Sequence, residues 1–440
     1  MTRRMRSTPA ASEVLQTAFA VIMLCTMAAV AVSVFIPEVN YIAGALALLA
    51  MVGGILIAAR RTRIVALIIA GVGTTALLVA WLGFGLDPSP SVLLDLNQDF
   101  ITMIAAVGLL RLIAVSGDAT PRLRGRAALV RTGWVVHLVG SVINVVVVGL
   151  AADRLRVGGR LALADASLLS RSFMTASIWT PFWVAPAVAA SRVGETNLLG
   201  YTAIGFCIGM GLTAIFALDN ARARTAEELR AFTGYTLSWR SAVVPMVLVV
   251  LIAIAHTVFP DTSVPRLVVV AVVLVVVVAL IPREGVRALP AVVGYGVRNF
   301  ASNRSETSIL TSAGLLTTGL LALQTVTHFA LPVAEFSGWT AWLVVVFITV
   351  LSLAGVHQFI TFSIAASVIV PLQPEPTLFI LSSTMGWAIG SIVGPLSGIA
   401  NFLNGQYGVR NLELVRSNLP AAAVGLIVAL PVLMLIDVTL

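Results

Sequence analysis

The segment that decides the fold is a run of small polar residues inside an apolar stretch, and it reads Ser170-Arg171-Ser172-Phe173-Met174-Thr175-Ala176-Ser177-Ile178-Trp179-Thr180-Pro181. The second half of the chain has a counterpart, which reads Gly355-Val356-His357-Gln358-Phe359-Ile360-Thr361-Phe362-Ser363. Inside a membrane, a helix can break only where hydroxyl groups or neighbouring helices satisfy the freed backbone groups. Both runs therefore predict re-entrant or broken helices, over about residues 160–190 and 340–371.

The whole chain has the composition of a membrane protein. Of its 440 residues, 59% are hydrophobic and 10% are charged, and the mean hydropathy is +1.03. Soluble proteins carry roughly 25% charged residues, so this chain cannot cover a water-facing surface of its size. Its apolar runs are continuous and about 20 residues long, which is the length that crosses a bilayer as a helix. We expect an all-α polytopic membrane protein.

Plain spans are expected at residues 14–36, 41–59, 64–84, 99–115, 134–152, 197–218, 241–259, 265–282, 306–324, 377–400 and 419–440. The first of these follows a basic start but is too long for the core of a signal peptide, so we interpret it as a retained span. No loop exceeds about 25 residues, which leaves no room for a separate soluble domain.

The charge balance indicates membrane anchoring. Net charge is +8, and all 27 basic residues are arginine. Because the arginines lie in short loops between spans, the positive-inside rule explains them better than nucleic-acid binding does. The absence of lysine excludes Schiff-base chemistry and the P-loop lysine. Two cysteines, Cys25 and Cys207, lie inside apolar runs and form neither a disulfide framework nor a metal site.

Four blocks of the first half match the second half in the same order, which indicates an internal duplication. They pair Asn97–Leu110 with Asn303–Leu316, Thr132-Gly133-Trp134 with Ser337-Gly338-Trp339, Phe173–Ile178 with Phe359–Ile364, and Gly205–Gly209 with Gly386–Gly390. The predicted parts are N-terminal scaffold spans (1–96), a first repeat (97–218), a basic loop with scaffold spans (219–302), a second repeat (303–418) and a C-terminal span (419–440).

The arginines predict that the two copies run in opposite directions. After its first span the first copy carries Arg122, Arg124, Arg126 and Arg131, whereas the second copy has its basic stretch, Arg283 to Arg304, before that span. Inverted repeats of this kind are typical of secondary transporters. The topology of residues 134–190 stays open, because either treatment of this stretch places a group of arginines outside.

The interruptions are the best candidates for a binding site. Helix ends at mid-membrane offer N–H groups to an anion, hydroxyl groups can donate to its oxygens, and freed carbonyls can coordinate Na⁺. Taken singly, each Ser or Thr is more readily explained by helix packing. The candidate substrate-binding residues are Thr175, Ser177, Thr180, His357, Gln358, Thr361, Ser363, Ser383, Thr384, Ser397 and Asn401. The two Thr-x-Ser pairs are expected to face one cavity, and Asp165 is expected to pair with Arg171.

This order of a span, a surface arm, a hairpin with a Ser/Thr tip and a Gly-interrupted helix, repeated in inverted orientation, resembles the ion transporter superfamily. That group includes divalent anion/sodium symporters, arsenite permeases and the large subunit of tripartite (TRAP) dicarboxylate transporters. The resemblance covers about 97–218 and 303–418 and implies elevator movement of a hairpin domain against a scaffold. It puts hairpin tips at Thr175 to Pro181 and His357 to Ser363, and broken helices at about Gly200–Gly211 and Ser383–Asn401.

Neither tip carries the Ser-Asn-Thr signature of the sodium–dicarboxylate branch or the Asp-Asn pair of the arsenite branch, so the resemblance names no branch. The leading hypothesis is a secondary active transporter of a small, carboxylate-like anion in the inner membrane of a bacterium. It would be a homodimer without a cofactor, coupled to Na⁺ or H⁺. The alternatives are a membrane-embedded enzyme or lipid-handling protein, such as a flippase or polymerase, and a channel.

Overall fold

The computed structural model describes residues 9–89, 94, 96–113, 123–193, 197–234, 243–327 and 335–440. Arg122, used above to predict orientation, lies outside these ranges. The chain divides into two compact units, each made of two separate stretches. Unit 1 comprises Met1–Ile113 and Leu248–Phe329, and unit 2 comprises Ala114–Val247 and Ala330–Leu440.

Unit 1 contains α1 (Pro9–Val32), α2 (Val39–Ile57), α3 (Arg60–Leu78), α5 (Gln98–Gly108), most of α12 (Val243–Val258), α13 (Val264–Glu284), α14 (Ala288–Asn299) and α15 (Arg304–Thr327). Helix α15 packs along α3 and α2, while α13 packs on α5. Glycines allow the closest of these contacts, since a Cβ atom at Gly319 would lie 2.1 Å from the carbonyl oxygen of Gly73. Small residues are the usual means by which membrane helices approach this closely.

A polar cluster fastens three helices of unit 1 to one another. The carboxylate of Asp99, in the first turn of α5, accepts hydrogen bonds from Ser263 and Arg266 at the start of α13. The same guanidinium reaches Asn40 of α2 at 3.1 Å, and Gln98 donates to that amide oxygen. Both side chains of the ion pair are only about 15% exposed, so their charges are stabilised by fixed protein partners and not by water.

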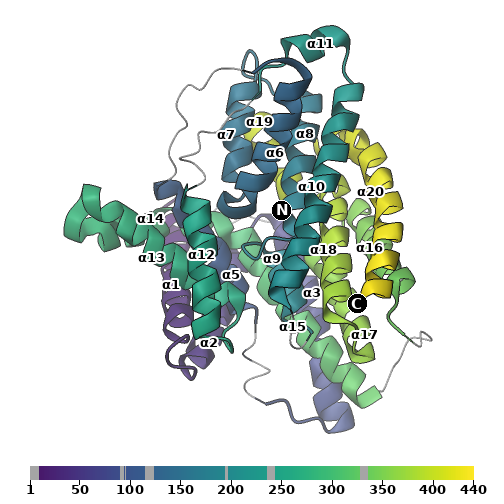
Figure 1. Cartoon of the computed structure of the whole chain (residues 1–440). Helices are drawn as coiled ribbons and strands as arrows, with labels where there is room; N and C mark the ends of the chain where they lie inside the picture. The colour runs from purple at the N-terminus through teal and green to yellow at the C-terminus, as the bar shows by residue number, and fades with distance from the viewer. Residues whose placement is uncertain are drawn as a thin grey trace, which may run out of the picture. The chain divides into compact units, whose positions relative to one another are not determined.

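Unit 2 contains α6 (Gly125–Ile143), α7 (Val146–Leu155), α8 (Leu163–Thr175), α9 (Val184–Ala190), α10 (Leu198–Arg222), α11 (Ala226–Ala231), α16 (Gly338–Leu353), α17 (Gln358–Ile369), α18 (Pro376–Val393), α19 (Gly398–Tyr407) and α20 (Asn411–Thr439). Its core is α18, which packs against α16, α20, α9 and α8 (Figure 1). Every residue of α18 from Thr377 to Val393 is buried, including Ser382, Ser383, Thr384 and Ser391.

Seven described segments are long and apolar enough to cross a membrane: Ser12–Val32, Val39–Ile57, Arg60–Gly83, Leu199–Arg222, Val264–Thr327, Pro376–Tyr407 and Asn411–Thr439. The expected all-α, multi-pass class is therefore confirmed. Several expected elements differ in detail. The C-terminal helix begins at Asn411 rather than at 419, and it packs within unit 2 on α16 and α18.

The first half of unit 2 corrects two expected elements. Residues 134–152 were expected to form one span, but the helix turns at Asn144, whose backbone angles (φ 57°, ψ −150°) are not helical. Helices α6 and α7 therefore form the hairpin of this half. Residues 160–190, expected to be re-entrant or broken, form a helix that breaks between α8 and α9, and not the hairpin that the resemblance implied.

Candidate functional site

Unit 2 is built from two copies of one order of helices. In the first copy the hairpin α6–α7 is followed by the broken helix α8–α9 and by α10. In the second copy the hairpin α16–α17 is followed by the broken helix α18–α19 and by α20. The packing repeats with the order: α6 packs on α8 and α10, just as α16 packs on α18 and α20. The duplication thus extends to tertiary contacts.

This order shows that the third and fourth sequence matches were wrong. Residues 173–178 end a broken helix, whereas 359–364 belong to the second arm of a hairpin. Residues 205–209 lie in the unbroken α10, which was expected to break, and 386–390 lie in α18. The structure instead pairs Ser177-Ile178-x-x-Pro181 with Ser391-Ile392-x-x-Pro395, at the two breaks. Apolar helices align easily by chance, and that similarity had misdirected the match.

The first break follows α8, which ends in a 3₁₀ turn at Ala176–Ile178 before the chain leaves helical geometry at Trp179. Proline at 181 has no N–H to donate, which favours a break in the helix here. The carbonyl oxygen of Ile178 accepts instead from Thr384 of α18 and Tyr201 of α10, both at 3.2 Å. Side chains from two other helices thereby satisfy the broken end.

The second break, Gly394 to Ser397, is satisfied in a related way. The amide of Asn418, fully buried on α20, donates to the carbonyl oxygen of Ile392 at 2.8 Å and to Ser170 of α8 at 3.2 Å. Asn411 donates to the carbonyl oxygen of Pro395 at 2.7 Å, and Asn401 donates to that of Leu396 at 3.1 Å. Ser397 caps α19 by accepting from the N–H of Ala400.

These bonds show that the two broken helices run in opposite directions. Ile178, in the 3₁₀ turn after α8, meets Thr384 of α18, and Ser170 of α8 is bridged to Ile392 by the amide of Asn418. Moving forward along α8 therefore means moving backward along α18. The two contacts are also equivalent under the repeat. Ile178 and Ile392 hold equivalent places before their prolines, and each is linked to the broken helix of the other copy. The crossing has the local geometry of an inverted pair.

Each hairpin tip lies against the break of the helix that follows it. In the first copy, Thr180 donates to the carbonyl oxygen of Ser141 at 2.8 Å, and the indole of Trp183 donates to that of Gly140 at 3.1 Å. In the second copy, a Cβ atom at Gly355 would lie 3.9 Å from both Pro395 and Leu396. These positions make the breaks and the tips one candidate site in each copy.

The predicted residues of the second copy gather partly at this site. His357 caps α17 by accepting from the N–H of Phe359 at 3.2 Å. Gln358 is 2% exposed, and its Nε2 would lie 2.6 Å from a Cβ atom at Gly394, so the side chain lies against the break. Thr361 and Ser363 lie farther along α17 than the tip that was predicted for them; Thr361 donates to the carbonyl oxygen of Gln358.

Buried hydroxyls nearby differ in whether they have a partner. Thr384 donates across to the first break, whereas the hydroxyl oxygens of Ser363 and Ser383 are buried without a hydrogen-bond partner among the described residues. Such groups are costly to bury, so they are available to a ligand or to water.

The predicted residues of the first copy have different surroundings. Ser177 donates to the carbonyl oxygen of Met174, and Thr180 reaches the hairpin as described. Thr175 is bonded to His137 of α6 and Thr213 of α10, within a fully buried cluster. A cavity shared by Thr175, Ser177, Thr361 and Ser363 stays a prediction.

The expected Asp165–Arg171 pair was wrong, because the two side chains leave α8 towards different partners. Asp165 accepts from Arg224 at 2.7 Å, and Arg171 donates to Asp219 of α10 at 2.7 Å. Arg171 is 4% exposed and also donates to Asn418, which ties the ion pair to the second break. Sequence reasoning missed Asn418 and Tyr201, because single polar residues on apolar helices carry no pattern.

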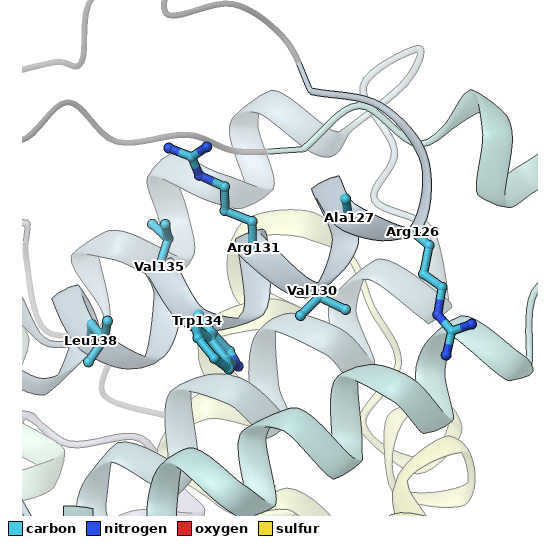
Figure 2. Close-up of a pocket in the computed structure, with 7 residues that line it drawn as sticks. All are labelled: Arg126, Ala127, Val130, Arg131, Trp134, Val135 and Leu138. Atoms are coloured by element: carbon cyan, nitrogen blue, oxygen red, sulfur yellow. The ribbon is translucent and has the colours of Figure 1, made fainter.

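A cavity outside these breaks lies along one face of α6. It has a volume of about 750 Å³ and is lined by Arg126, Ala127, Val130, Arg131, Trp134, Val135 and Leu138 (Figure 2). Figure 2 shows the two arginines pointing away from each other, so they do not converge on one anion. None of the predicted substrate-binding residues lines it.

No protein-family model and no curated protein matches the sequence. Among solved structures, the chain is similar to the YdaH transporter of Alcanivorax borkumensis, whose crystal structure reveals an unusual topology. The TM-score is 0.55, the identity is 16%, and the match covers 84% of this chain and 98% of that one. At this identity the likeness shows a shared fold alone.

Proposed function

We propose that this protein is a secondary active transporter that moves a small, carboxylate-like anion across the inner membrane of a bacterium, coupled to Na⁺ or H⁺. The observation that carries the proposal is the pair of hairpin-and-broken-helix copies in unit 2, whose broken helices cross in opposite directions. Such a pair can exchange the environments of its two halves, which gives a carrier two states of similar energy. The fold shared with YdaH supports this reading.

The chemistry of the second break favours an anion. His357 and Ser397 cap the N-terminal ends of α17 and α19. The free N–H groups at the start of a helix attract negative charge. The side chain of Gln358 lies beside this break, where its amide could donate to a carboxylate oxygen. Asn401 would add a second neutral amide at this break, while the hydroxyl groups of Ser363 and Ser383, which have no partner among the described residues, would serve the substrate farther along α17 and α18. We propose these residues as the substrate site.

An elevator mechanism would use unit 2 as the moving body and unit 1 as the scaffold. Unit 1 has the features of a fixed part, because the Asp99–Arg266 cluster and the glycine contact of α3 with α15 hold its helices tightly. A second copy of the chain would steady the scaffold, and we propose a homodimer as the simplest symmetric arrangement.

A binding screen followed by flux measurements tests the proposal. Purified protein in detergent is heated with carboxylates, sulfonates and oxyanions, each with and without Na⁺. A substrate should raise the melting temperature, since it binds only the folded state. Labelled substrate should then enter proteoliposomes against its gradient when a Na⁺ or proton gradient is imposed. Uptake that only equilibrates, whatever gradient is imposed, would contradict secondary active transport.

A further inference from the structure

His137 is the most completely enclosed titratable side chain of the first hairpin. It lies on α6, is fully buried, and bonds to three elements of unit 2. Its Nδ1 is 3.0 Å from the hydroxyl oxygen of Thr175 on α8 and 2.9 Å from that of Thr213 on α10. Its Nε2 accepts from the indole N–H of Trp179, in the break, at 3.0 Å.

The protons of this cluster can be assigned from its donors. An indole nitrogen can only donate, so Nε2 of His137 must carry a lone pair and Nδ1 must carry the proton of the neutral ring. Thr175 can then donate to Thr213, 2.6 Å away, and Thr213 to the carbonyl oxygen of Gly209 at 2.8 Å. The cluster is fully satisfied with a neutral imidazole.

A proton added to His137 has one place to go, and that place is Nε2. The new N–H would face the N–H of Trp179, so the hydrogen bond between the two rings would be lost. Trp179 can move because it lies in the break. The backbone N–H groups of Trp179 and Thr180 both donate to the carbonyl oxygen of Ala176, at 3.4 Å and 3.3 Å. Both bonds are longer than usual for a helix.

The surroundings of the ring offer no charge to stabilise the extra proton. His137 contacts the side chains of Thr175, Thr213 and Trp179 and the backbone of Ser172 and Gly209, all of them neutral. Asp165 and Arg171 of α8 are paired with Arg224 and Asp219, while the 3₁₀ turn Ala176–Ile178 carries no titratable group. The other titratable groups on α6 and on the elements packed against it are Arg126 and Arg131 of α6, Asp153 and Arg154 of α7, Tyr201, Cys207 and Arg222 of α10, and Glu227, Glu228 and Arg230 of α11.

Two glycines of α10 hold this cluster tightly closed. A Cβ atom at Gly209 would lie 3.0 Å from Cδ1 of Trp179 and 3.1 Å from Cε1 of His137, and one at Gly205 would lie 3.0 Å from Cβ of Trp179. Because the indole has no slack against α10, its hydrogen bond cannot be lost by a small local adjustment. A change at His137 therefore has to move the break itself.

We propose that His137 is a proton-binding site whose occupancy releases the break of α8 through Trp179, so that H⁺ is the coupling ion. This inference rests on the transport function proposed above. The neutral ring holds Trp179 and keeps the first break closed on α6 and α10. The protonated ring loses its hydrogen bond to the indole, and the Trp179–Trp183 segment is released. Binding of a proton is thereby coupled to a change in one of the two breaks.

Hydrogen–deuterium exchange of the purified full-length protein tests the device without any substrate. Peptides that cover residues 176–183 are compared at pH 4 and pH 8, after correction for the intrinsic effect of pH on exchange. Loss of one hydrogen bond should make these peptides exchange about three- to tenfold faster at pH 4. If the unmodified protein shows equal corrected rates at the two pH values, the proposal is overturned without the need for any variant.

Two pairs of variants assign the effect to the two rings. His137→Gln cannot titrate and should abolish the pH response, whereas His256→Gln, on α12 of unit 1, should leave it unchanged. Trp179→Phe should exchange fast at both pH values. Its matched control, Trp183→Phe, loses an indole bond to Gly140 but keeps His137, so its response to pH should persist. A pH response that survives in His137→Gln would overturn the assignment.

The failure of this inference can be told apart from failure of the transport function. Active flux that ignores the proton gradient would overturn the coupling role of His137 and leave the transporter standing. If no active flux of any candidate anion occurs, the proposed function fails, while the exchange measurements still decide whether His137 controls the break.

Discussion

At the residue scale, two glycines of α10 lie two positions apart and have opposite surroundings. A Cβ atom at Gly209 would press on Thr175, Trp179 and His137, all within 3.1 Å, whereas one at Gly211 would meet nothing within 4 Å. Gly209→Ala should therefore cost about 1–3 kcal/mol of stability through overpacking. Gly211→Ala should be neutral or stabilise by up to about 1 kcal/mol, because alanine favours the helix.

Thermal unfolding of the two variants in the same detergent measures the difference. Equal melting temperatures would contradict the tight packing described between α10 and the first break. The contrast also shows what the sequence could not provide, since Gly205, Gly209 and Gly211 look alike in a list of small residues. Only the crossing of α10 over the break separates them.

Asn418 makes a second prediction at this scale. Its side chain is fully buried and bonds to Arg171, Ser170 and the carbonyl oxygen of Ile392. Asn418→Ala would leave a buried guanidinium and a buried carbonyl with fewer partners, at a cost of about 1–3 kcal/mol. Asn299→Ala, which removes one bond within the half-buried last turn of α14, should cost about 1 kcal/mol or less and serves as the control. A melting temperature equal to that of the control would refute the role given to Asn418.

At the element scale, the ion pair of α5 and α13 fixes the geometry of unit 1. Asp99→Asn keeps the shape but leaves Arg266 without its charged partner, in a site where both side chains are about 15% exposed. We expect a loss of about 1–3 kcal/mol. Glu413→Gln removes the partner of Arg410 in an exposed pair and should cost at most about 1 kcal/mol. Similar melting temperatures for the two variants would show that the buried cluster does not stabilise unit 1.

The elements also show where sequence reasoning succeeds and where it fails. The break of α18 was predictable, because Gly394-Pro395 in the middle of an apolar run removes an N–H and weakens the helix. The hairpin at Asn144 was not, since one asparagine in an apolar stretch resembles an ordinary packing residue. The missed signal was the repeated Ser-Ile-x-x-Pro at 177–181 and 391–395, which marks equivalent breaks.

At the scale of the whole molecule, an inverted repeat makes a prediction about sidedness. Val157 follows the second arm of the first hairpin, and Gln373 follows the second arm of the second hairpin. Single cysteines at these exposed positions, in a background without Cys25 and Cys207, should react with a membrane-impermeant thiol reagent from opposite sides of the membrane. Labelling of both from the same side would contradict inverted topology.

The likeness to YdaH covers most of both chains and gives the fold, but the residues that bind a substrate depend on contacts that two chains at 16% identity need not share. In this chain those contacts are the backbone groups of two breaks, which sequence reasoning located only in part. The sequence does not single out His137, because one histidine near a helix end forms no pattern with its neighbours. Its three partners come from segments that the sequence separates by up to 76 positions.

Counterflow in proteoliposomes tests the central claim most directly. Vesicles are loaded with a high concentration of the unlabelled anion that best raises the melting temperature, and are diluted into a trace of the same anion carrying a label. A carrier whose site faces one side at a time should accumulate label transiently above its outside concentration and then release it. Label that only equilibrates would indicate a channel, and label that stays outside would show that the anion is not transported; either result would contradict the account.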